Sequence, residues 1–244
     1  MPEILADFAR GTLDLLWPRE CFLCAASLGG TADRWLCASC REGLALFREG
    51  DPLCARCSSP LGPGASEDSC RDCARLPGRF EAVRAAGAYR GTLRRLVTGF
   101  KYAHRTPNAW PLGELLAERL RGWGPLQGGA VLVPFPGTAA ARRRRGFDPP
   151  ALLAAEVAER LGLRLEPDVL RRSGNPPPQA SLSRTDRLTA PRGTVEVARP
   201  AAIRGRTVLL VDDVLTTGAT ASEAARALRA AGSGPVLVAV AART

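Results

Sequence analysis

The chain has 244 residues, 45% of them hydrophobic, with a formal net charge of +10 and a pI of about 10.0. This length allows one mid-sized domain with a sizeable core and a second, smaller domain. No stretch reaches the ~18 to 20 consecutive apolar residues of a membrane span. The charge predicts anionic partners. Arginine supplies nearly all of it, so a run of arginines alone says little about a binding site.

The first residues do not have the pattern of a secretory signal. Acidic side chains, Glu3 and Asp7, stand where a signal peptide carries bases. Residues 3 to 16 fit a short amphipathic helix that packs against the segment after it, and the acids argue against a membrane-surface role. We therefore expect a cytoplasmic protein without a membrane span.

Eight cysteines form four C-x-x-C pairs, and twelve or thirteen residues separate one pair from the next. A C-x-x-C turn places two thiolates on one tetrahedral ion, so four such turns complete two structural zinc sites. We predict that successive pairs combine into two ribbons. The spacing leaves open a crossed arrangement of first with third and second with fourth. The predicted zinc ligands are Cys21, Cys24, Cys37, Cys40, Cys54, Cys57, Cys70 and Cys73.

Two rival interpretations of the cysteines are weaker. A disulfide framework needs an oxidising compartment, and no secretory signal accompanies these cysteines. A redox-active C-x-x-C is disfavoured by four regular copies. Zinc also answers a folding problem, because residues 20 to 78 contain few large apolar side chains and could hardly fold without a metal.

From residue 80 onward, strand and helix patterns alternate, which predicts an open, mostly parallel sheet with helices on both faces. We therefore predict two domains, a helix and double ribbon over 1–79 and an α/β domain over 80–244. A short helix and a loop are expected within 90–104. The other predicted strands and helices cover 80–89, 112–120, 130–134, 151–161, 194–197, 208–211, 221–229 and 235–241.

The most informative stretch begins with the apolar run 208–211, which fits a strand buried on both faces. Two carboxylates, Asp212 and Asp213, follow where a parallel strand delivers its end to a crevice. A loop of small and hydroxylated residues comes next and leads into a helix, so backbone amides, hydroxyls and the helix dipole favour a phosphate. Two acids beside a phosphate site suit a sugar phosphate, because ribose hydroxyls donate to carboxylates. The loop residues are Thr216, Thr217, Gly218, Ala219 and Thr220.

A second anion site is predicted at the end of strand 130–134. There a Pro/Gly loop with Pro136 and Gly137 precedes the run Arg142 to Arg145, which is a plausible seat for pyrophosphate. The competing interpretation is a solvated basic loop. Lys101 is the only lysine, and a compact ammonium there is either functional or a chance surface residue. His104, the only histidine, fits a surface or phosphate contact better than a catalytic base. The Pro-rich segment 171–187 is expected to be a long binding loop.

The stretch 208–220 resembles the phosphoribosyl-pyrophosphate (PRPP) signature of the type I phosphoribosyltransferases at every position. The whole chain resembles the ComF family, in which a double zinc ribbon precedes a phosphoribosyltransferase-like domain and which is associated with bacterial natural competence. Besides the cysteines and the signature, the resemblance rests on Phe100-Lys101-Tyr102, Val133-Pro134-Phe135-Pro136, Arg145-Gly146-Phe147, Gln179, Leu182 and Arg187.

The resemblance implies a type I phosphoribosyltransferase-like fold and displacement at C1′ of PRPP with loss of pyrophosphate. Asp212 and Asp213 would hold the ribose hydroxyls, partly through Mg²⁺, and the loop 216–220 would hold the 5′-phosphate. The loop 136–145, with Arg142 and Arg145, and Lys101 would neutralise the pyrophosphate. The alternative is a non-enzymatic adaptor of the competence machinery that binds single-stranded DNA and competence proteins through its ribbons and arginines.

This chain departs from the family pattern at two places. Asp148 and Pro149 follow the Arg-Gly-Phe motif where the family has Asn-Gln, and Ala190 stands about where an asparagine is usual. Both segments are expected to face the pocket. The departures therefore concern acceptor binding and turnover more than the PRPP site.

Overall fold

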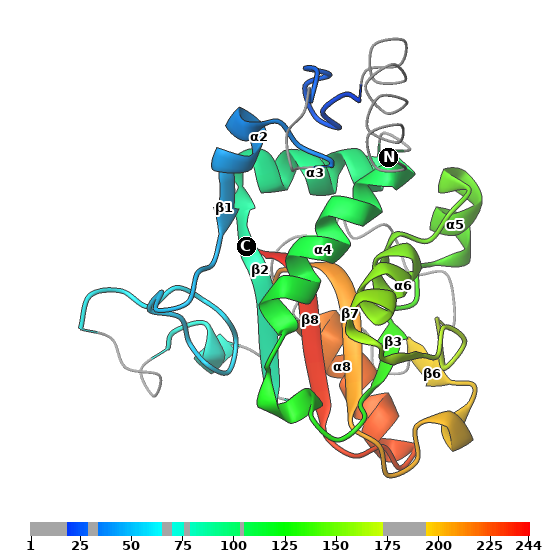
Figure 1. The fold of residues 1–244 in the computed structure, drawn as a ribbon. Coiled ribbons are helices and arrows are strands. Elements are labelled where there is room, and N and C mark those ends of the chain that lie inside the picture. Colours follow the sequence, from blue (N-terminus) through cyan, green and yellow to red (C-terminus); the bar gives the residue numbers. More distant parts are fainter. Residues whose placement is uncertain (1–18, 29–33, 65–69, 76–78, 103–104, 173–193) are drawn as a thin grey trace, which may run out of the picture.

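The structure is a computed structural model that describes residues 19–28, 34–64, 70–75, 79–102, 105–172 and 194–244. The helix expected over 3–16, His104, and all but the first two residues of the loop expected over 171–187 lie outside the described residues. Figure 1 shows a central sheet with helices on both faces. This confirms the expected α/β class with a mostly parallel sheet.

Six strands form the sheet in the order β1-β2-β8-β7-β3-β4. All neighbouring pairs are parallel except β1 with β2. A separate antiparallel pair consists of β5 and β6. The strands are β1 (Leu44–Leu46), β2 (Ala82–Arg90), β3 (Val131–Pro134), β4 (Arg164–Leu165), β5 (Leu170–Arg172), β6 (Val195–Val197), β7 (Val208–Leu215) and β8 (Val236–Arg243).

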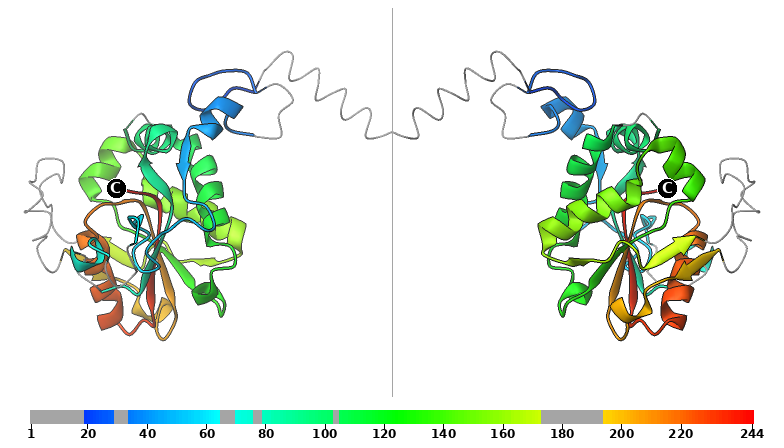
Figure 2. Two further views of the ribbon diagram at one scale, coloured as in Figure 1. Left: turned by 90° about the vertical axis from the view of Figure 1, so that its left-hand side faces the viewer. Right: turned by 90° about the vertical axis from the view of Figure 1, so that its right-hand side faces the viewer.

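The helices cover the two faces of this sheet. In Figure 1, α4 and α6 lie in front of it and α8 behind it, and Figure 2 shows the same layers from the two sides. Short 3-10 turns occupy 73–75, 106–108, 124–126 and 200–202. The α-helices of the described residues are α2 (Ala38–Glu42), α3 (Gly91–Tyr102), α4 (Ala109–Leu120), α5 (Ala139–Arg145), α6 (Pro149–Leu161) and α8 (Ala219–Ala230).

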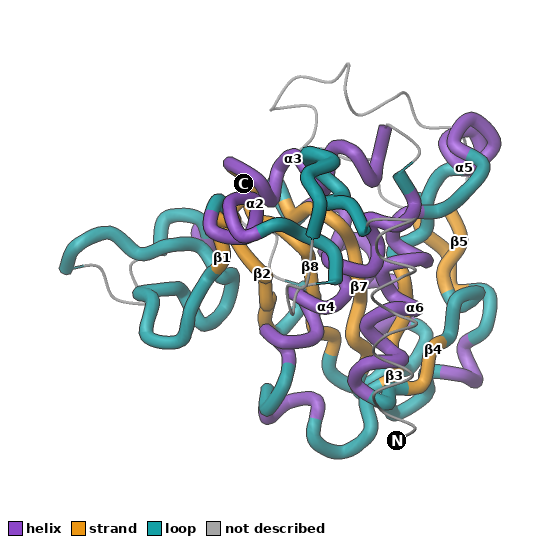
Figure 3. Tube along the Cα trace, turned by 45° about the horizontal axis from the view of Figure 1, so that its top comes forward, coloured by secondary structure: helices purple, strands orange, loops and turns teal. Residues whose placement is uncertain are grey.

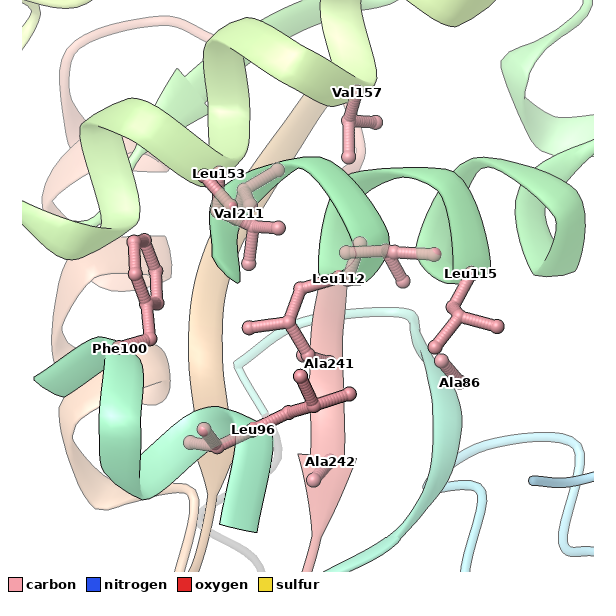
Figure 4. Close-up of a cluster of buried hydrophobic side chains, with 14 of the residues drawn as sticks. Ala86, Leu96, Phe100, Leu112, Leu115, Leu153, Val157, Val211, Ala241 and Ala242 are labelled. Atoms are coloured by element: carbon pink, nitrogen blue, oxygen red, sulfur yellow. The ribbon is translucent and has the colours of Figure 1, made fainter. Parts of the chain in front are cut away.

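Two apolar cores form because strand residues alternate between the faces of the sheet. On β7, Leu209 and Val211 pack toward α3, α4 and α6, whereas Val208 and Leu210 pack toward α8. Figure 4 shows the first core, with Leu112 of α4 and Leu153 of α6 over Val211. Burial on both faces explains why 208–211 is a continuous apolar run.

Strand β7 is longer than its apolar run predicts. The strand continues through both aspartates to Leu215, because β8 supplies pairing partners that far: Asp212 pairs with Val240 and Leu215 with Arg243. The carboxylates are therefore attached to sheet backbone, not to a loop. Their positions are fixed by the hydrogen-bond ladder on that side.

The direction of the connections reverses between β3 and β7. These strands are neighbours, but the chain leaves β3 through α6 toward β4 and leaves β7 through α8 toward β8, in opposite directions along the sheet. A reversal of this kind is where open α/β sheets bind ligands. The two predicted anion-binding loops come directly after these two strands, so the topology brings them together.

The cysteine ribbons consist mostly of loops, as Figure 3 shows. Strand β1, which lies between the second and third cysteine pairs, joins the edge of the sheet beside β2. It comes so near that a Cβ on Gly87 would lie 2.2 Å from the Ala45 carbonyl oxygen. The proposed boundary between 79 and 80 stays a prediction.

Among the described residues, none of the helices combines the length and the apolar character that a bilayer-spanning segment needs.

Candidate zinc centres and phosphate-binding site

The eight cysteines gather into two groups of four. Within each group, the sulfur atoms all lie within 4.8 Å of one another. The groups are formed by successive C-x-x-C pairs, so the crossed arrangement is excluded. The first group is Cys21, Cys24, Cys37 and Cys40, and the second is Cys54, Cys57, Cys70 and Cys73.

Both groups fit a tetrahedral zinc ion. Zinc–sulfur bonds of about 2.3 Å place neighbouring thiolates about 3.8 Å apart. The sulfur–sulfur distances are 3.5 Å for Cys24–Cys37, 3.4 Å for Cys54–Cys73 and 3.6 Å for Cys57–Cys70. All eight residues are free cysteines rather than disulfides. The ligand type, the number of ligands and their spacing together indicate two structural zinc sites.

The thiols of the first group have widely separated acidities. Burial, followed by hydrogen bonds to the neighbouring thiols, raises the pKa of Cys40 to about 12. Burial also opposes ionisation of Cys21, but surrounding backbone hydrogen bonds lower the pKa of its thiol to about 6. Protons and a metal ion compete for such a group, so zinc binding releases protons.

The two zinc ribbons rest on different parts of the molecule. In the first, Phe22 and Trp35 lie against Trp110 of α4, and Trp35 Nε1 donates to Glu114 at 3.1 Å. In the second, Ser58 Oγ donates to the Val83 carbonyl of β2 at 2.8 Å. The first ribbon therefore packs on the helical layer and the second on the sheet.

The acidic pair at the end of β7 is held close together. The Asp213 backbone N–H donates to Asp212 Oδ1 at 2.8 Å. Burial and then the Asp213 charge raise the pKa of Asp212 well above its usual value, against the opposing effect of Lys101. Two carboxylates so near each other favour a ligand that brings hydroxyl donors or positive charge.

Lys101 is the partner of this pair. Its Nζ lies 2.8 Å from Asp213 Oδ1, and the two side chains are only 22% and 6% exposed. Burial alone would lower the pKa of Lys101, but the charges of Asp213 and Asp212 raise it. Lys101 is therefore a largely buried partner of the acidic pair, not an exposed surface lysine. It stands on α3, and the first core fixes that helix through Phe100.

The hydroxyl-rich loop connects β7 to α8. Gly218 has φ = 70°, in the left-handed region that glycine adopts without strain, and it stands just before the helix. Thr217 Oγ1 accepts from the Ala219 N–H at 3.4 Å. Thr216 is exposed, and Thr217 and Thr220 are partly buried. The positive end of the α8 dipole therefore lies a few residues after the acidic pair, at the end of the hydroxyl loop.

The arginine run after β3 is a helix, whereas a loop is expected from the sequence. Thr138 is the N-cap, since its hydroxyl accepts from the Ala141 N–H at 3.0 Å, and Gly146 ends α5 with φ = 75°. Arg142, Arg143 and Arg144 are exposed. Arg145 instead turns toward α3, where its guanidinium lies 5.3 Å from the centre of the Tyr102 ring. The loop that remains between β3 and α5 contains Pro136 and Gly137.

Asp148, one of the departures from the family pattern, faces this shortened loop. Its Oδ2 accepts weakly from the Gly137 N–H at 3.4 Å. Burial raises the pKa of Asp148, and the nearby Arg142 and Arg145 oppose that effect. A carboxylate therefore faces the loop that is predicted to bind pyrophosphate. It interacts with arginines that would also bind that ligand. As N-cap of α6 with Pro149 behind it, Asp148 also begins that helix.

Two site residues cannot be identified from their local sequence. The guanidinium of Arg172, on β5, lies 5.6 Å from the centre of the Phe135 ring. Burial lowers the pKa of Arg172, and the nearby Asp212 charge opposes that effect. Arg243 of β8 donates to the Thr216 carbonyl at the start of the hydroxyl loop. Both belong to a chain rich in arginine, where only the fold distinguishes them from surface charge.

Comparisons with known proteins agree with this geometry. Residues 12–74 match the double zinc ribbon domain, and residues 151–243 match the phosphoribosyl transferase domain. The second match includes the acidic pair and the hydroxyl loop but not Lys101 or α5. Together they confirm the expected order of a double ribbon and a phosphoribosyltransferase-type domain.

Curated relatives cover most of the chain. It is 29% identical to DNA utilization protein YhgH of Salmonella typhi, over 91% of this chain and 95% of the relative. It is 26% identical to Competence protein F of Haemophilus influenzae, over 87% and 92%. An adenine phosphoribosyltransferase of Frankia casuarinae is 45% identical over 41% of this chain and 49% of its own length.

Zinc content and release test the two centres. We expect elemental analysis to find two zinc ions per chain. A chelator should remove them in two phases, because Cys24 of the first group is exposed whereas Cys54, Cys57 and Cys70 of the second are buried. Cys24→Ser should abolish the fast phase and leave the slow one. A zinc content near zero, or loss of the slow phase in Cys24→Ser, would contradict the assignment.

A double-mutant cycle tests the buried ion pair. Lys101→Met leaves both carboxylates uncompensated and should destabilise the fold by roughly 3–5 kcal/mol in urea unfolding with zinc present. Asp213→Asn should cost less, because the Asp212 charge still acts on Lys101. The double variant should lose less than the sum, with a coupling of about 1–3 kcal/mol. The control is Arg226 with Glu223 on α8, where the cycle Arg226→Met, Glu223→Gln should give about 0.5 kcal/mol or less. Equal coupling in the two cycles would refute the role of Lys101.

Proposed function

Since this chain has the ComF architecture, a double zinc ribbon followed by a phosphoribosyltransferase domain, we propose that it binds PRPP together with Mg²⁺. One observation carries the proposal. At the reversal of the sheet, β7 brings the pair Asp212 and Asp213, the loop 216–220 and the start of α8 to one crevice, with Lys101 beside them. A sugar phosphate with a second anionic group matches each of these parts.

The 5′-phosphate is assigned to the loop 216–220. Its backbone amides and threonine hydroxyls donate hydrogen bonds, and the α8 dipole favours the negative charge. The ribose hydroxyls are assigned to Asp212 and Asp213, which accept from them. Bound Mg²⁺ would supply positive charge that the carboxylates and the pyrophosphate oxygens share.

The pyrophosphate is assigned to the opposite wall. Lys101 would donate to the pyrophosphate from one side. The loop at Pro136 and Gly137, together with Arg142 and Arg145 of α5, would bind it from the other side. In the free protein, Lys101 is paired with Asp213. With Asp213 engaged by ribose hydroxyls, Lys101 would be free to donate to the pyrophosphate. Charge that develops on a leaving pyrophosphate would be stabilised there, which supports transfer of the phosphoribosyl group to an acceptor.

A second candidate function is binding of single-stranded DNA in the cytoplasm during DNA uptake. The exposed arginines of α5 favour it, as do the names DNA utilization protein and Competence protein F of the relatives. Guanidinium groups neutralise backbone phosphates without reading sequence. This activity is compatible with PRPP binding, since it uses the outer surface of α5.

The PRPP proposal is tested by Thr217→Val, which removes one hydroxyl from the loop. By the rule that about 1.4 kcal/mol is a factor of ten, loss of one charge-assisted hydrogen bond should weaken PRPP binding roughly tenfold. Ribose 5-phosphate should lose affinity in parallel, and free pyrophosphate should not. Thr207→Val, the same change before the amino end of β7, is the control and should have no effect. No PRPP binding by the wild type at millimolar ligand, measured calorimetrically with Mg²⁺, would refute the proposal.

The DNA proposal is tested by reversing charge on α5. Arg143→Glu with Arg144→Glu should weaken binding of an unstructured oligonucleotide and reduce the slope of its salt dependence, because two phosphate contacts are lost. The control, Arg204→Glu with Arg206→Glu, changes two exposed arginines before the amino end of β7. Binding that is flat with salt, or weakened equally by both variants, would remove α5 as the DNA surface.

A further inference from the structure

Arg243 connects the second zinc ribbon to the phosphate loop. It stands near the end of β8 and is only 4% exposed. Its Nε donates to Ser59 Oγ at 2.8 Å, its Nη1 donates to the Thr216 carbonyl at 3.0 Å, and its Nη2 lies 3.5 Å from Asp72 Oδ2. One buried guanidinium therefore joins three segments that are far apart in the sequence.

Two partners of Arg243 lie in the sequence beside cysteines of the second group. Ser59 follows Cys57 by two residues, and Asp72 lies between Cys70 and Cys73. The Ser59 hydroxyl also donates to Asp72 Oδ2 at 2.7 Å. These residues come from the two different C-x-x-C turns of that group. The distance between these two turns therefore depends on the zinc ion that the four sulfur atoms would bind.

The third partner belongs to the proposed phosphate site. Thr216 is the first residue of the hydroxyl loop, and the preceding residue, Leu215, pairs with Arg243 across the sheet. The hydrogen bond to the Thr216 carbonyl fixes the peptide unit from which the loop leaves β7. The orientation of the following amides depends on that unit. A buried guanidinium is costly unless its donors have partners, so a shift of Ser59 and Asp72 changes how it holds Thr216.

We propose that Arg243 is a positioning residue that makes the geometry of the phosphate loop depend on zinc in the second cysteine group. The ligand named for this loop rests on the proposed PRPP site, but the coupling itself does not. The first zinc group packs instead on α3, through Arg95 and the Leu23 carbonyl, and on α4, through Trp35 and Trp110. Zinc in the second group should therefore matter to the loop, and zinc in the first should not.

Linkage makes the coupling reciprocal. If zinc in the second group improves phosphate binding by some factor, a bound phosphate must increase zinc affinity there by the same factor. Ribose 5-phosphate should then slow the later phase of zinc release. The early phase, from the first group, should be unchanged. This readout requires no turnover.

Two adjacent serines give a matched test. Ser59→Ala removes the hydroxyl that receives Arg243, and Ser58→Ala removes an equally buried hydroxyl that donates to β2. In the full zinc-loaded chain, amide hydrogen exchange over 216–221 should become about fivefold faster in Ser59→Ala and stay unchanged in Ser58→Ala. Zinc content, measured in parallel, should remain at two ions in both variants.

Arg243→Lys provides a second variant, because it keeps the charge but cannot reach all three partners. It should reproduce the faster exchange of the loop. Equal exchange in the wild type, Ser59→Ala and Arg243→Lys would overturn the proposal even if PRPP binds normally. Faster exchange without PRPP binding by the wild type would support the coupling and refute the PRPP site. The two failures are therefore distinguishable.

Discussion

The buried ion pair between Lys101 and Asp213 is the interaction on which the candidate site depends. Two adjacent carboxylates stand at the end of a strand that is buried on both faces, where an unpaired charge would be costly. Lys101 lies 2.8 Å from Asp213 and offsets that cost. The pair also fixes α3 against β7. The same contact therefore links α3, which packs in the first core, to the carboxylates of the candidate site.

Two carboxylates this close together lower the stability of the fold, but the same two groups are the ones proposed to bind the ligand. Burial and the Asp213 charge raise the pKa of Asp212, so the folded chain binds a proton there more tightly than the unfolded chain does. Its contribution to stability is therefore largest at low pH and falls as pH rises through the folded pKa. A ligand that brings hydroxyl donors and a divalent cation relieves this repulsion. The proposed sugar phosphate would therefore stabilise this part of the fold when it binds.

Much of this could be predicted from the sequence because the signals are local. The C-x-x-C spacing indicates two zinc sites, and the stretch 208–220 indicates a strand, a loop and a helix with acids at the junction. The helical nature of α5 had a local signal too: Thr138 before it and Gly146 after it are a cap and a terminator, and alanine and arginine favour helix. The four arginines themselves are equally compatible with a solvated basic loop, so their charge does not indicate the helix.

The remaining features depend on contacts between distant segments. Lys101 and Asp213 meet only because α3 packs beside β2 and β8 and places Lys101 at the end of the neighbouring β7. The spacing of the cysteines cannot distinguish successive from crossed pairing. Arg243 shows the same limit more sharply. In a sequence with one lysine and many arginines, a guanidinium that joins a zinc ribbon to a phosphate loop looks like any other. Only its burial and its three partners reveal its position between them.

The most direct test of the account is a crystal structure of the full zinc-loaded chain with PRPP and Mg²⁺. We expect the 5′-phosphate on the amides of residues 217–220 and the ribose hydroxyls on Asp212 and Asp213. We also expect Lys101 to turn from Asp213 toward the pyrophosphate. A phosphate bound elsewhere, or an unchanged pair of Lys101 and Asp213 beside an empty loop at saturating ligand, would contradict it.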